Sequence, residues 1–414
     1  MKTPLTITLE QARRFHLLHH GLYPPRQLHG KAGVMDYVKR VGCIQYDTIN
    51  VLGRNADLVL NARLQNYKPA ILEALLYEDR MLWDGFDKVQ SIYATADWPH
   101  FAKRREVMNL HYQERLKEMG ALQMATKIIA EIYENGPLSS IDIEDDSRTQ
   151  WSWGYDTRTV RACMEAMYAQ GILGVHHKIN TRRVFDLVEN LIPASLYKQD
   201  FPHATDEQYH DWHVLRRIGG LGLAHPKSSE KWLGILNVKS KERQAAIERL
   251  LAAGKIIAVD VKNLAKQRFY IRSLDLPSME KAAKKSRRKA RAAFIAPLDN
   301  ALWDRDLLRA LYAFNYVWEV YKPAKLRKFG YYVLPVLYGE QFVARLDAKF
   351  ERQTGKLWLN NWWWEKGVDM DPAMDAALAD CVLAFGRYLG AKAIHLGKKS
   401  RQKKNLTWMR TFSV

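Results

Sequence analysis

A glutamine and an aspartate lie two positions apart in an otherwise apolar run of the chain. The run is VGCIQYDTINVLGR, and its polar centre is Gln45-Tyr46-Asp47. In an extended segment Gln45 and Asp47 would point to the same face, because side chains alternate along a strand. In a helix they would be separated by about 200°. A carboxylate and an amide on one face can hold a water molecule, with the carboxylate accepting its proton and the amide orienting it.

A structural role competes with this chemical one. Aspartate is a common N-cap, so Asp47 could instead close the first turn of a helix that follows it. Buried polar pairs are also often structural, because each buried polar group needs a hydrogen-bond partner. The spacing alone therefore leaves two interpretations of Asp47 open, proton acceptor and helix cap.

Two predicted helices precede the motif. TLEQARRFHLLHHGL is typical of a helix with Thr8 as its N-cap and Gln11 at the third helical position. GKAGVMDYVKRVG carries apolar residues with the i, i+3, i+4, i+7 spacing of a helix face. The motif therefore leaves a helix inside a small helical domain. We expect residues from Asp57 to about Leu116 to continue as helices.

The middle of the chain contains an internal repeat. TRTVRACMEAMYAQGILGVHHKINTRRVFDLVE resembles SKERQAAIERLLAAGKIIAVDVKNLAKQRFYIRS, with Glu165 aligned to Glu248 and Gly171 to Gly254. Each copy predicts a helix that ends at its glycine, followed by two short strands joined by a polar turn. This is the order of the second half of a winged helix. Hairpins are therefore expected near residues 172–188 and 255–273.

The pattern changes to strands at Phe294. The β-branched and aromatic runs are FIAPL, YVWEVY, YYVLPVLYG, QFVARLDAKF and GKLWLNNWWW. They predict a five-stranded meander, either a small barrel or a curled sheet, over about residues 294–364. A helix should follow, with Asp371 as its cap and Pro372 at its first position, and the basic tail GKKSRQKK comes after it.

The predicted fold class is α+β, with tandem winged-helix (helix-turn-helix) units followed by a small β-barrel-like domain. The region around Gln45 would be the first of three such units. The expected divisions are 1–118 for the first winged-helix domain, 119–200 for the second, 201–280 for the third, 281–293 for a basic linker, and 294–414 for the β-rich domain with its helix and tail.

Composition limits the possible partners and compartments. Lys and Arg number 64 against 45 Asp and Glu, and the net charge of +19 indicates a polyanionic partner. The three cysteines are far apart in sequence, which favours reduced thiols in a cytoplasmic protein. No signal peptide or membrane-spanning segment is expected. The sequence lacks a Walker loop, HExxH and paired CxxC, so we expect no metal and no cofactor.

The ordered set of motifs resembles the winged-helix DNA glycosylases that act on alkylated bases and interstrand crosslinks, the YcaQ-like family. The resemblance rests on the Gln-x-Asp stretch with Asn50 and Arg54, together with RRFHLLHHGL, DLVLNARLQNY and YYVLPVLYGEQFVARLD. It covers most of the chain. One departure is Lys88, which stands where the family suggests a histidine, and this difference bears on the lesion preference.

The resemblance implies a monofunctional glycosylase that hydrolyses the N-glycosidic bond of N7-alkylpurines and unhooks crosslinks during base excision repair. Gln45 and Asp47 would be catalytic, and the protein would act on double-stranded DNA as a monomer. The expected DNA-binding residues are Asn50, Arg54, Arg158, Arg161, Arg182 and Arg183. The alternative is a winged-helix transcriptional regulator without enzymatic activity, since this fold serves regulators more often than enzymes. A regulator would have no need for the Gln45–Asp47 pair.

Overall fold

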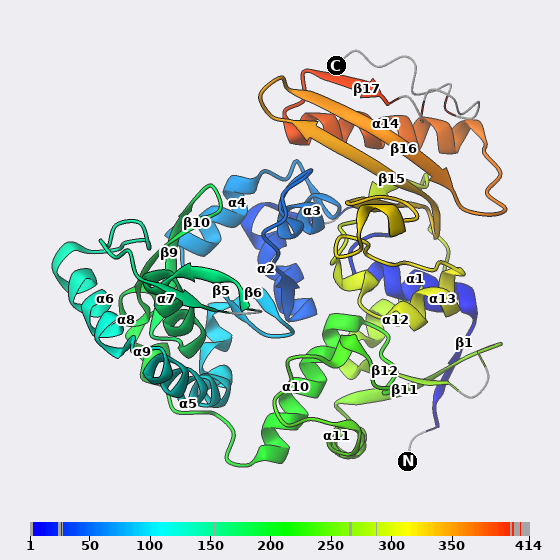
Figure 1. Ribbon diagram of the computed structural model, residues 1–414. Coiled ribbons are helices and arrows are strands. Elements are labelled where there is room, and N and C mark those ends of the chain that lie inside the picture. Colours follow the sequence, from blue (N-terminus) through cyan, green and yellow to red (C-terminus); the bar gives the residue numbers. More distant parts are fainter. Residues whose placement is uncertain are drawn as a thin grey trace. The chain divides into compact units, whose positions relative to one another are not determined.

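The computed structural model describes residues 3–23, 26, 28–151, 154–264, 267–286, 288–397, 400 and 406. They form two compact units, one of Met1–Leu72 with His210–Val414 and the other of Glu73–Tyr209. Helices and short sheets are mixed throughout both units (Figure 1), which confirms a mixed α and β fold. Of the predicted basic tail GKKSRQKK, the residues other than Gly397 and Ser400 lie outside the described part of the chain.

The N-terminal part of the first unit is a group of short helices and strands. Its elements are β1 (Leu5–Ile7), α1 (Leu9–His19), β2 (Leu28–His29), α2 (Gly30–Val41), β3 (Cys43–Gln45), α3 (Asn55–Asn61), β4 (Leu64–Gln65) and α4 (Pro69–Glu73). The predicted capping box is confirmed, because Thr8 Oγ1 accepts the backbone N–H of Gln11 and Gln11 Oε1 accepts that of Thr8. Both predicted helices form where local sequence signals place them.

The second copy of the repeat also lies in this unit. The elements of this part of the chain are α10 (Asp206–Leu221), whose first turn belongs to the other unit, the 3-10 turn η4 (Glu230–Trp232), α11 (Ser240–Ala252), β11 (Ile256–Val261), β12 (Arg268–Arg272), η5 (Ser273–Asp275) and α12 (Leu276–Ala282). The predicted helix and antiparallel hairpin are confirmed, with Ile257 opposite Ile271. Gly254 ends the helical segment with φ 65°. β1 adds to this hairpin as a parallel third strand, which the sequence analysis did not predict.

A five-stranded sheet forms the C-terminal part of the first unit. Its elements are β13 (Ala292–Phe294), η6 (Asn300–Leu302), α13 (Arg305–Tyr312), η7 (Ala324–Leu326), β14 (Val333–Tyr338), β15 (Gln341–Glu351), β16 (Lys356–Trp364), α14 (Pro372–Leu389) and β17 (Ala393–Leu396). The strand order is β13-β14-β15-β16-β17, so β13 and β17 are the two edges of an open half-barrel. Helix α14 packs against β13 and β14 and is capped by Asp371 as predicted.

The predicted strand YVWEVY is wrong. Residues 313–319 have no regular structure and Val320 lies in a turn, although Tyr316, Glu319 and Val320 are all buried. The Glu319 carboxylate accepts the backbone N–H groups of Lys328 and Phe329, at 3.1 and 2.8 Å. The Glu319 side chain thus satisfies two backbone N–H donors that would otherwise need the carbonyl groups of a neighbouring strand. The fifth strand is instead β17, which pairs parallel with β16.

The second unit, Glu73–Tyr209, contains the first copy of the repeat. Its elements are the π-helical turn η1 (Ala74–Glu78), β5 (Leu82–Phe86), β6 (Gln90–Ala94), η2 (Thr95–Phe101), α5 (Ala102–Glu118), α6 (Leu122–Asn135), β7 (Arg148–Gln150), β8 (Asp156–Arg158), α7 (Thr159–Gln170), β9 (Leu173–Ile179), β10 (Arg182–Leu187), α8 (Val188–Leu191) and α9 (Ala194–Tyr197). The β9–β10 hairpin is confirmed, and Gly171 ends α7 in the left-handed region with φ 77°.

The prediction that Asp57 to Leu116 is all helical is wrong at β5 and β6, which form an antiparallel hairpin. Both faces of this hairpin are mostly buried, so the sequence lacks the polar and apolar alternation that reveals a half-exposed strand. Asp84 is buried in β5 and forms an ion pair with Lys178 and a 2.9 Å hydrogen bond from the Tyr168 hydroxyl.

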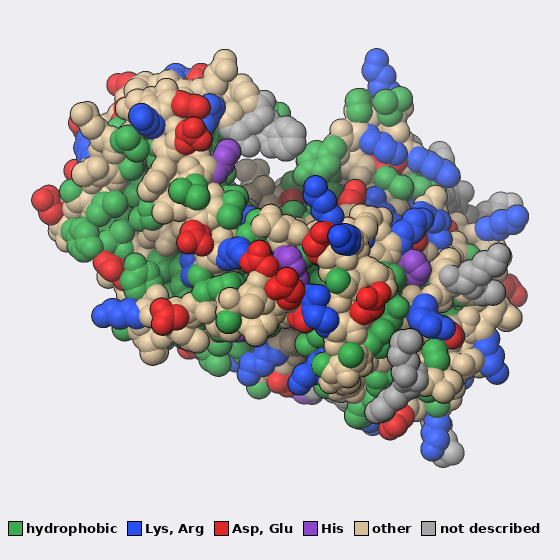
Figure 2. Space-filling view, turned by 90° about the horizontal axis from the view of Figure 1, so that it is seen from below, with side chains coloured by type: hydrophobic (Ala, Val, Ile, Leu, Met, Phe, Trp, Pro, Cys, Tyr) green, Lys and Arg blue, Asp and Glu red, His purple; other side chains and the backbone are tan. Residues whose placement is uncertain are grey.

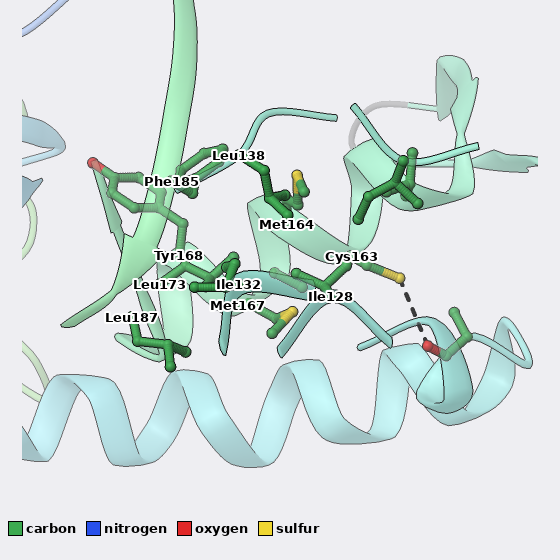
Figure 3. Close-up of a cluster of buried hydrophobic side chains, with 14 of the residues drawn as sticks. Ile128, Ile132, Leu138, Cys163, Met164, Met167, Tyr168, Leu173, Phe185 and Leu187 are labelled. Atoms are coloured by element: carbon green, nitrogen blue, oxygen red, sulfur yellow. Dashed lines mark hydrogen bonds between the residues drawn. The ribbon is translucent and has the colours of Figure 1, made fainter. Parts of the chain in front are cut away.

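Helix α7 is the centre of the core of this unit. Val160, Cys163, Met164 and Met167, the predicted apolar stripe, are each at most 1% exposed. They pack among side chains of α6, β9 and β10 (Figure 3). The Cys163 thiol donates to the carbonyl of Ala121 at 3.7 Å. The stripe is therefore structural, and Cys163 serves as a small buried side chain.

Candidate active site

The Gln-x-Asp motif lies between helices α2 and α3 in the first unit. Gly42 ends α2 with φ 82°, and strand β3 follows and ends at Gln45. Tyr46 is only 8% exposed, whereas Gln45 and Asp47 on either side of it are half-buried. This alternation is that of an extended chain, so the two polar side chains share the more exposed side.

Asp47 does not cap a helix. The next helix, α3, starts at Asn55, and its N-cap residue is Arg54. Asp47 Oδ1 instead accepts the backbone N–H of Ile49 at 2.7 Å, which closes a local Asx turn. In the described part of the chain no donor reaches the second oxygen, Oδ2. The turn fixes the orientation of the carboxylate and leaves Oδ2 available to a water molecule or a positive charge.

The environment makes this carboxyl group a stronger base than an ordinary aspartate. Burial raises the pKa of Asp47 above its usual range, and the hydrogen bond from Ile49 only partly opposes the shift. A carboxyl group with a raised pKa accepts a proton more readily at neutral pH. Raised pKa values in half-buried carboxyl groups are typical of sites that transfer protons.

Two tyrosines distant in sequence lie within electrostatic range of Asp47. The pKa of Tyr321 is raised by desolvation and then by the Asp47 charge. The pKa of Tyr332 is raised by burial, then by Tyr316 and by Asp47. Tyr332 is buried, but Tyr321 is 81% exposed. Neither tyrosine was expected near Asp47, because the aromatic runs that contain them were assigned to strands.

The segment after Asp47 is held by the C-terminal sheet. Arg352, in the turn between β15 and β16, donates from Nη2 to the backbone carbonyl of Asn50 at 3.0 Å and to the Asn50 side-chain oxygen. Gly53 adopts φ 142°, and a Cβ atom there would lie 3.2 Å from the Tyr388 hydroxyl. The loop between Asp47 and α3 therefore has one close-fitting path, fixed by residues that follow it by roughly 300 positions.

Arg54 also has partners within the protein. Its Nε donates to Asp57 Oδ2 at 2.5 Å, and Asp57 Oδ1 accepts the Tyr67 hydroxyl at 2.6 Å. The Arg54 side chain is 20% exposed. These contacts give Asn50 and Arg54 positioning roles around the motif, and their contact with DNA stays a prediction.

The remaining predicted DNA-binding residues belong to the unit Glu73–Tyr209. The Arg158 guanidinium donates to the carbonyls of Ser140, Ile143 and Asp145, so it ties a loop together. Arg161 is exposed and pairs with Glu165 along α7. Arg182 and Arg183 lie in β10. Their contact with DNA likewise stays a prediction.

Arg182 and Arg183 differ in their surroundings. Arg182 is exposed beside the hairpin turn, whereas the Arg183 guanidinium lies 4.9 Å from the centre of the Tyr168 ring. Lys88 occupies the turn between β5 and β6, within the same unit.

The described residues contain no group of three or more His, Cys, Asp or Glu side chains arranged to hold a metal ion. Over the same residues, none of the helices has the length and apolarity that a membrane span requires.

A family model and a solved structure each match most of this chain. The model of the family described as DNA glycosylase AlkZ-like matches residues 38–388, which includes the Gln-x-Asp motif. The solved structure of Streptomyces sahachiroi DNA glycosylase AlkZ superimposes with a TM-score of 0.59 at 12% sequence identity. The match covers 95% of this chain and 99% of that one. At this identity the structural match shows a common fold.

Proposed function

Because the chain belongs to the DNA glycosylase AlkZ-like family of hydrolytic N-glycosylases, we propose that it releases N7-alkylpurines from duplex DNA with Asp47 as the catalytic base. The observation that carries the proposal is the state of the Asp47 carboxyl group. It is half-buried, has a raised pKa, is fixed through Oδ1 and has an unbonded Oδ2. The proposed enzyme needs no cofactor.

The chemistry requires little more than one positioned carboxylate. A purine alkylated at N7 carries a positive charge, so the bond between C1′ and N9 can break with both electrons going to the departing neutral base. The sugar then develops oxocarbenium character. Asp47 stabilises this charge and accepts the proton of the water that attacks C1′, while Gln45 orients that water. The proposed reaction uses water as the nucleophile and no lysine, so the enzyme would be monofunctional, without a Schiff base.

An open site would suit bulky and crosslinked lesions. A base joined to the opposite strand cannot rotate fully out of the duplex, as ordinary base flipping requires. Asp47 is half-buried rather than enclosed, and the exposed Tyr321 nearby offers an aromatic face against which a base could stack. We therefore extend the proposal to the unhooking of interstrand crosslinks.

The proposed DNA-binding elements are three winged-helix units. Helix α7 with β9–β10 and helix α11 with β11–β12 have the order of elements expected for two of them, and the region around Gln45 would be the first. On the face drawn in Figure 2, Lys and Arg side chains are spread among acidic and apolar ones. We propose that a monomer in the cytoplasm grips the DNA backbone through such dispersed contacts, including Arg161 and Arg182.

The direct test uses a duplex with a single N7-methylguanine. The full-length protein should release free N7-methylguanine and leave an abasic site that alkali converts to a strand break. Mass spectrometry of the released base distinguishes hydrolysis from nuclease action. Binding of DNA without base release from any N7-alkylated duplex would favour the regulator alternative over the enzyme.

The rate of base release should fall as the pH falls through the raised pKa of Asp47. A general base works only when ionised, so activity is present above this pKa and lost below it. Single-turnover rates should be corrected for enzyme-free depurination. The logarithm of the rate should then rise with a slope of about one per pH unit below the pKa of Asp47 and become constant above it. The residual rate of Asp47→Asn should not show this rise with pH. A wild-type rate that stays flat throughout the carboxyl range would contradict the assignment.

Arg352→Ala should slow base release by roughly 10–100-fold, because small misplacements of a catalytic group are costly. The loop containing Asn50 loses its anchor, so the single-turnover rate at saturating enzyme should fall. Melting temperature should change little, since an exposed arginine contributes little to stability. Lys349→Ala, which removes a positive charge from the same hairpin, serves as the control. If both variants only weaken DNA binding, Arg352 contacts phosphate and does not position the loop.

A further inference from the structure

Two arginines far apart in sequence, Arg26 and Arg291, form hydrogen bonds with backbone carbonyl groups of the same short segment, residues 62–64, in the first unit. Arg26 Nη1 approaches the carbonyl of Leu64 at 3.5 Å. Arg291 Nη2 donates to the carbonyl of Ala62 at 3.0 Å and approaches that of Gly21 at 3.4 Å. Arg26 precedes β2, and Arg291 precedes β13. Both guanidinium groups are therefore held beside the stretch 62–64.

Several donors of this pair are buried without an acceptor. Nε of Arg26 and both Nε and Nη1 of Arg291 are shielded from solvent and have no hydrogen-bond partner in the described part of the chain. A guanidinium presents five N–H donors in one rigid plane, so each arginine has N–H donors that no acceptor satisfies. The two groups are close enough that the charge of Arg26 lowers the pKa of Arg291.

No negative charge balances this pair within the described residues. Neither arginine forms an ion pair with a carboxylate there. The acidic group nearest in electrostatic terms is the Cys381 thiol of α14, and burial raises its pKa to about 11. At neutral pH the thiol is therefore protonated and uncharged. Burial and the neighbouring Arg26 in turn lower the pKa of Arg291 to about 9.

An unbalanced arrangement of this kind is costly. Buried charges in proteins are normally paired or bound to an ion, since desolvation of an unpaired charge costs several kcal/mol. Carbonyl oxygens offset part of this cost, but they bear no net charge and leave the Nε donors unused. Two guanidinium groups with free forks match the acceptors of a tetrahedral oxyanion.

We propose that Arg26 and Arg291 form an oxyanion-binding site of the phosphate class, separate from Asp47. Its occupant is either inorganic phosphate or a phosphodiester of bound DNA, since both present the same tetrahedral oxygens. The anion bridges the two guanidinium groups and completes the junction between the segment 62–64 and the C-terminal sheet. The site holds this junction together whether or not a lesion is present.

Thermal unfolding of the full-length protein tests the site. Phosphate, compared with chloride at equal ionic strength, should raise the melting temperature of the wild type by ~2–4 °C or more. Arg26→Met keeps much of the apolar stem and removes the charge, so phosphate should no longer raise its melting temperature. Without phosphate, Arg26→Met should melt at or above the wild type, because the repulsion between the two arginines is relieved. Arg268→Met, which removes an exposed arginine paired with Asp260, should keep the full response to phosphate.

Binding of lesion-free duplex at matched ionic strength identifies the source of the anion. If a DNA phosphodiester occupies the site, Arg26→Met should weaken DNA binding by roughly 10-fold, and phosphate should compete with DNA for the wild type. If inorganic phosphate occupies it, DNA binding should be the same in both proteins. The proposal is overturned if phosphate raises the melting temperature of Arg26→Met as much as that of the wild type. It is also overturned if phosphate leaves the wild type unchanged and Arg26→Met binds DNA normally.

Discussion

Asp47→Asn should lower base release from an N7-methylguanine duplex by ~10²–10⁴-fold, down to the enzyme-free rate if Asp47 carries the whole effect. Asparagine has the same shape and can still accept the Ile49 N–H that holds Asp47. It loses the negative charge that stabilises the sugar cation and the basicity that removes the proton from water. Single-turnover kinetics with saturating protein measure the loss directly.

Folding and DNA binding should survive this substitution. Folding raises the pKa of Asp47, so the ionised carboxylate is disfavoured in the folded protein and costs stability above that pKa. Asparagine removes this cost, and the melting temperature at neutral pH should equal or exceed that of the wild type. DNA affinity should be retained, because the proposed contacts are dispersed over other side chains.

Gln45→Ala is the matched variant in the same motif. It should reduce the rate by less than Asp47→Asn, because a poorly oriented water can still reach the carboxylate. Base excision by Asp47→Asn at the wild-type rate would end the assignment of Asp47 as the base. A greater loss with Gln45→Ala than with Asp47→Asn would move the main catalytic role to the amide.

Arg63→Met should destabilise the first unit by ~3–5 kcal/mol, because it leaves a buried carboxylate without its partner. The Arg63 guanidinium donates to both oxygens of Asp299, at 2.8 and 2.6 Å, and to the carbonyl of Val59. Both side chains of the pair are 0% exposed. Urea unfolding followed by tryptophan fluorescence measures the change.

Two controls separate the buried pair from a general effect of lost charge. Arg268→Ala removes an arginine whose ion pair with Asp260 is exposed, and it should cost at most ~1 kcal/mol. The double variant Arg63→Met with Asp299→Asn should recover much of the loss, because no buried charge remains. Asparagine at 299 can still accept the backbone N–H of Ala301, as Asp299 does. An Arg63→Met protein as stable as Arg268→Ala would show that the pair contributes nothing.

Local signals in the sequence were sufficient for several elements. The capping box of Thr8 and Gln11, the Asp371 cap and the glycine ends of the repeated helices depend on residues a few positions apart. The hairpins near 172–188 and 255–273 formed for the same reason, since each strand lies next to its partner in sequence. The conformation at Gln45 was left open between strand and helix, and the structure shows a strand that ends at Gln45. The role of Asp47 was left open between proton acceptor and helix cap. The structure shows that its carboxylate accepts the Ile49 N–H and caps no helix.

Predictions failed where burial, and not local propensity, decides the conformation. The hairpin β5–β6 is buried on both faces, so it lacks an alternating pattern. YVWEVY has the composition of a strand, yet Glu319 satisfies the backbone donors of the segment that follows it. Strand β17 pairs parallel with β16 across the helix α14, and nothing in its four residues specifies that partner.

The sequence by itself therefore determined the family resemblance, the Gln45–Asp47 pair and most of the helices, because these are properties of short segments. Only the tertiary structure brought Tyr321 near Asp47, Arg352 to Asn50, Asp299 to Arg63 and Arg291 beside Arg26. These contacts join residues separated by more than two hundred positions. Such pairings depend on which apolar faces of the helices and sheets pack against each other. A single sequence shows which faces are apolar, but it does not show which of them are in contact.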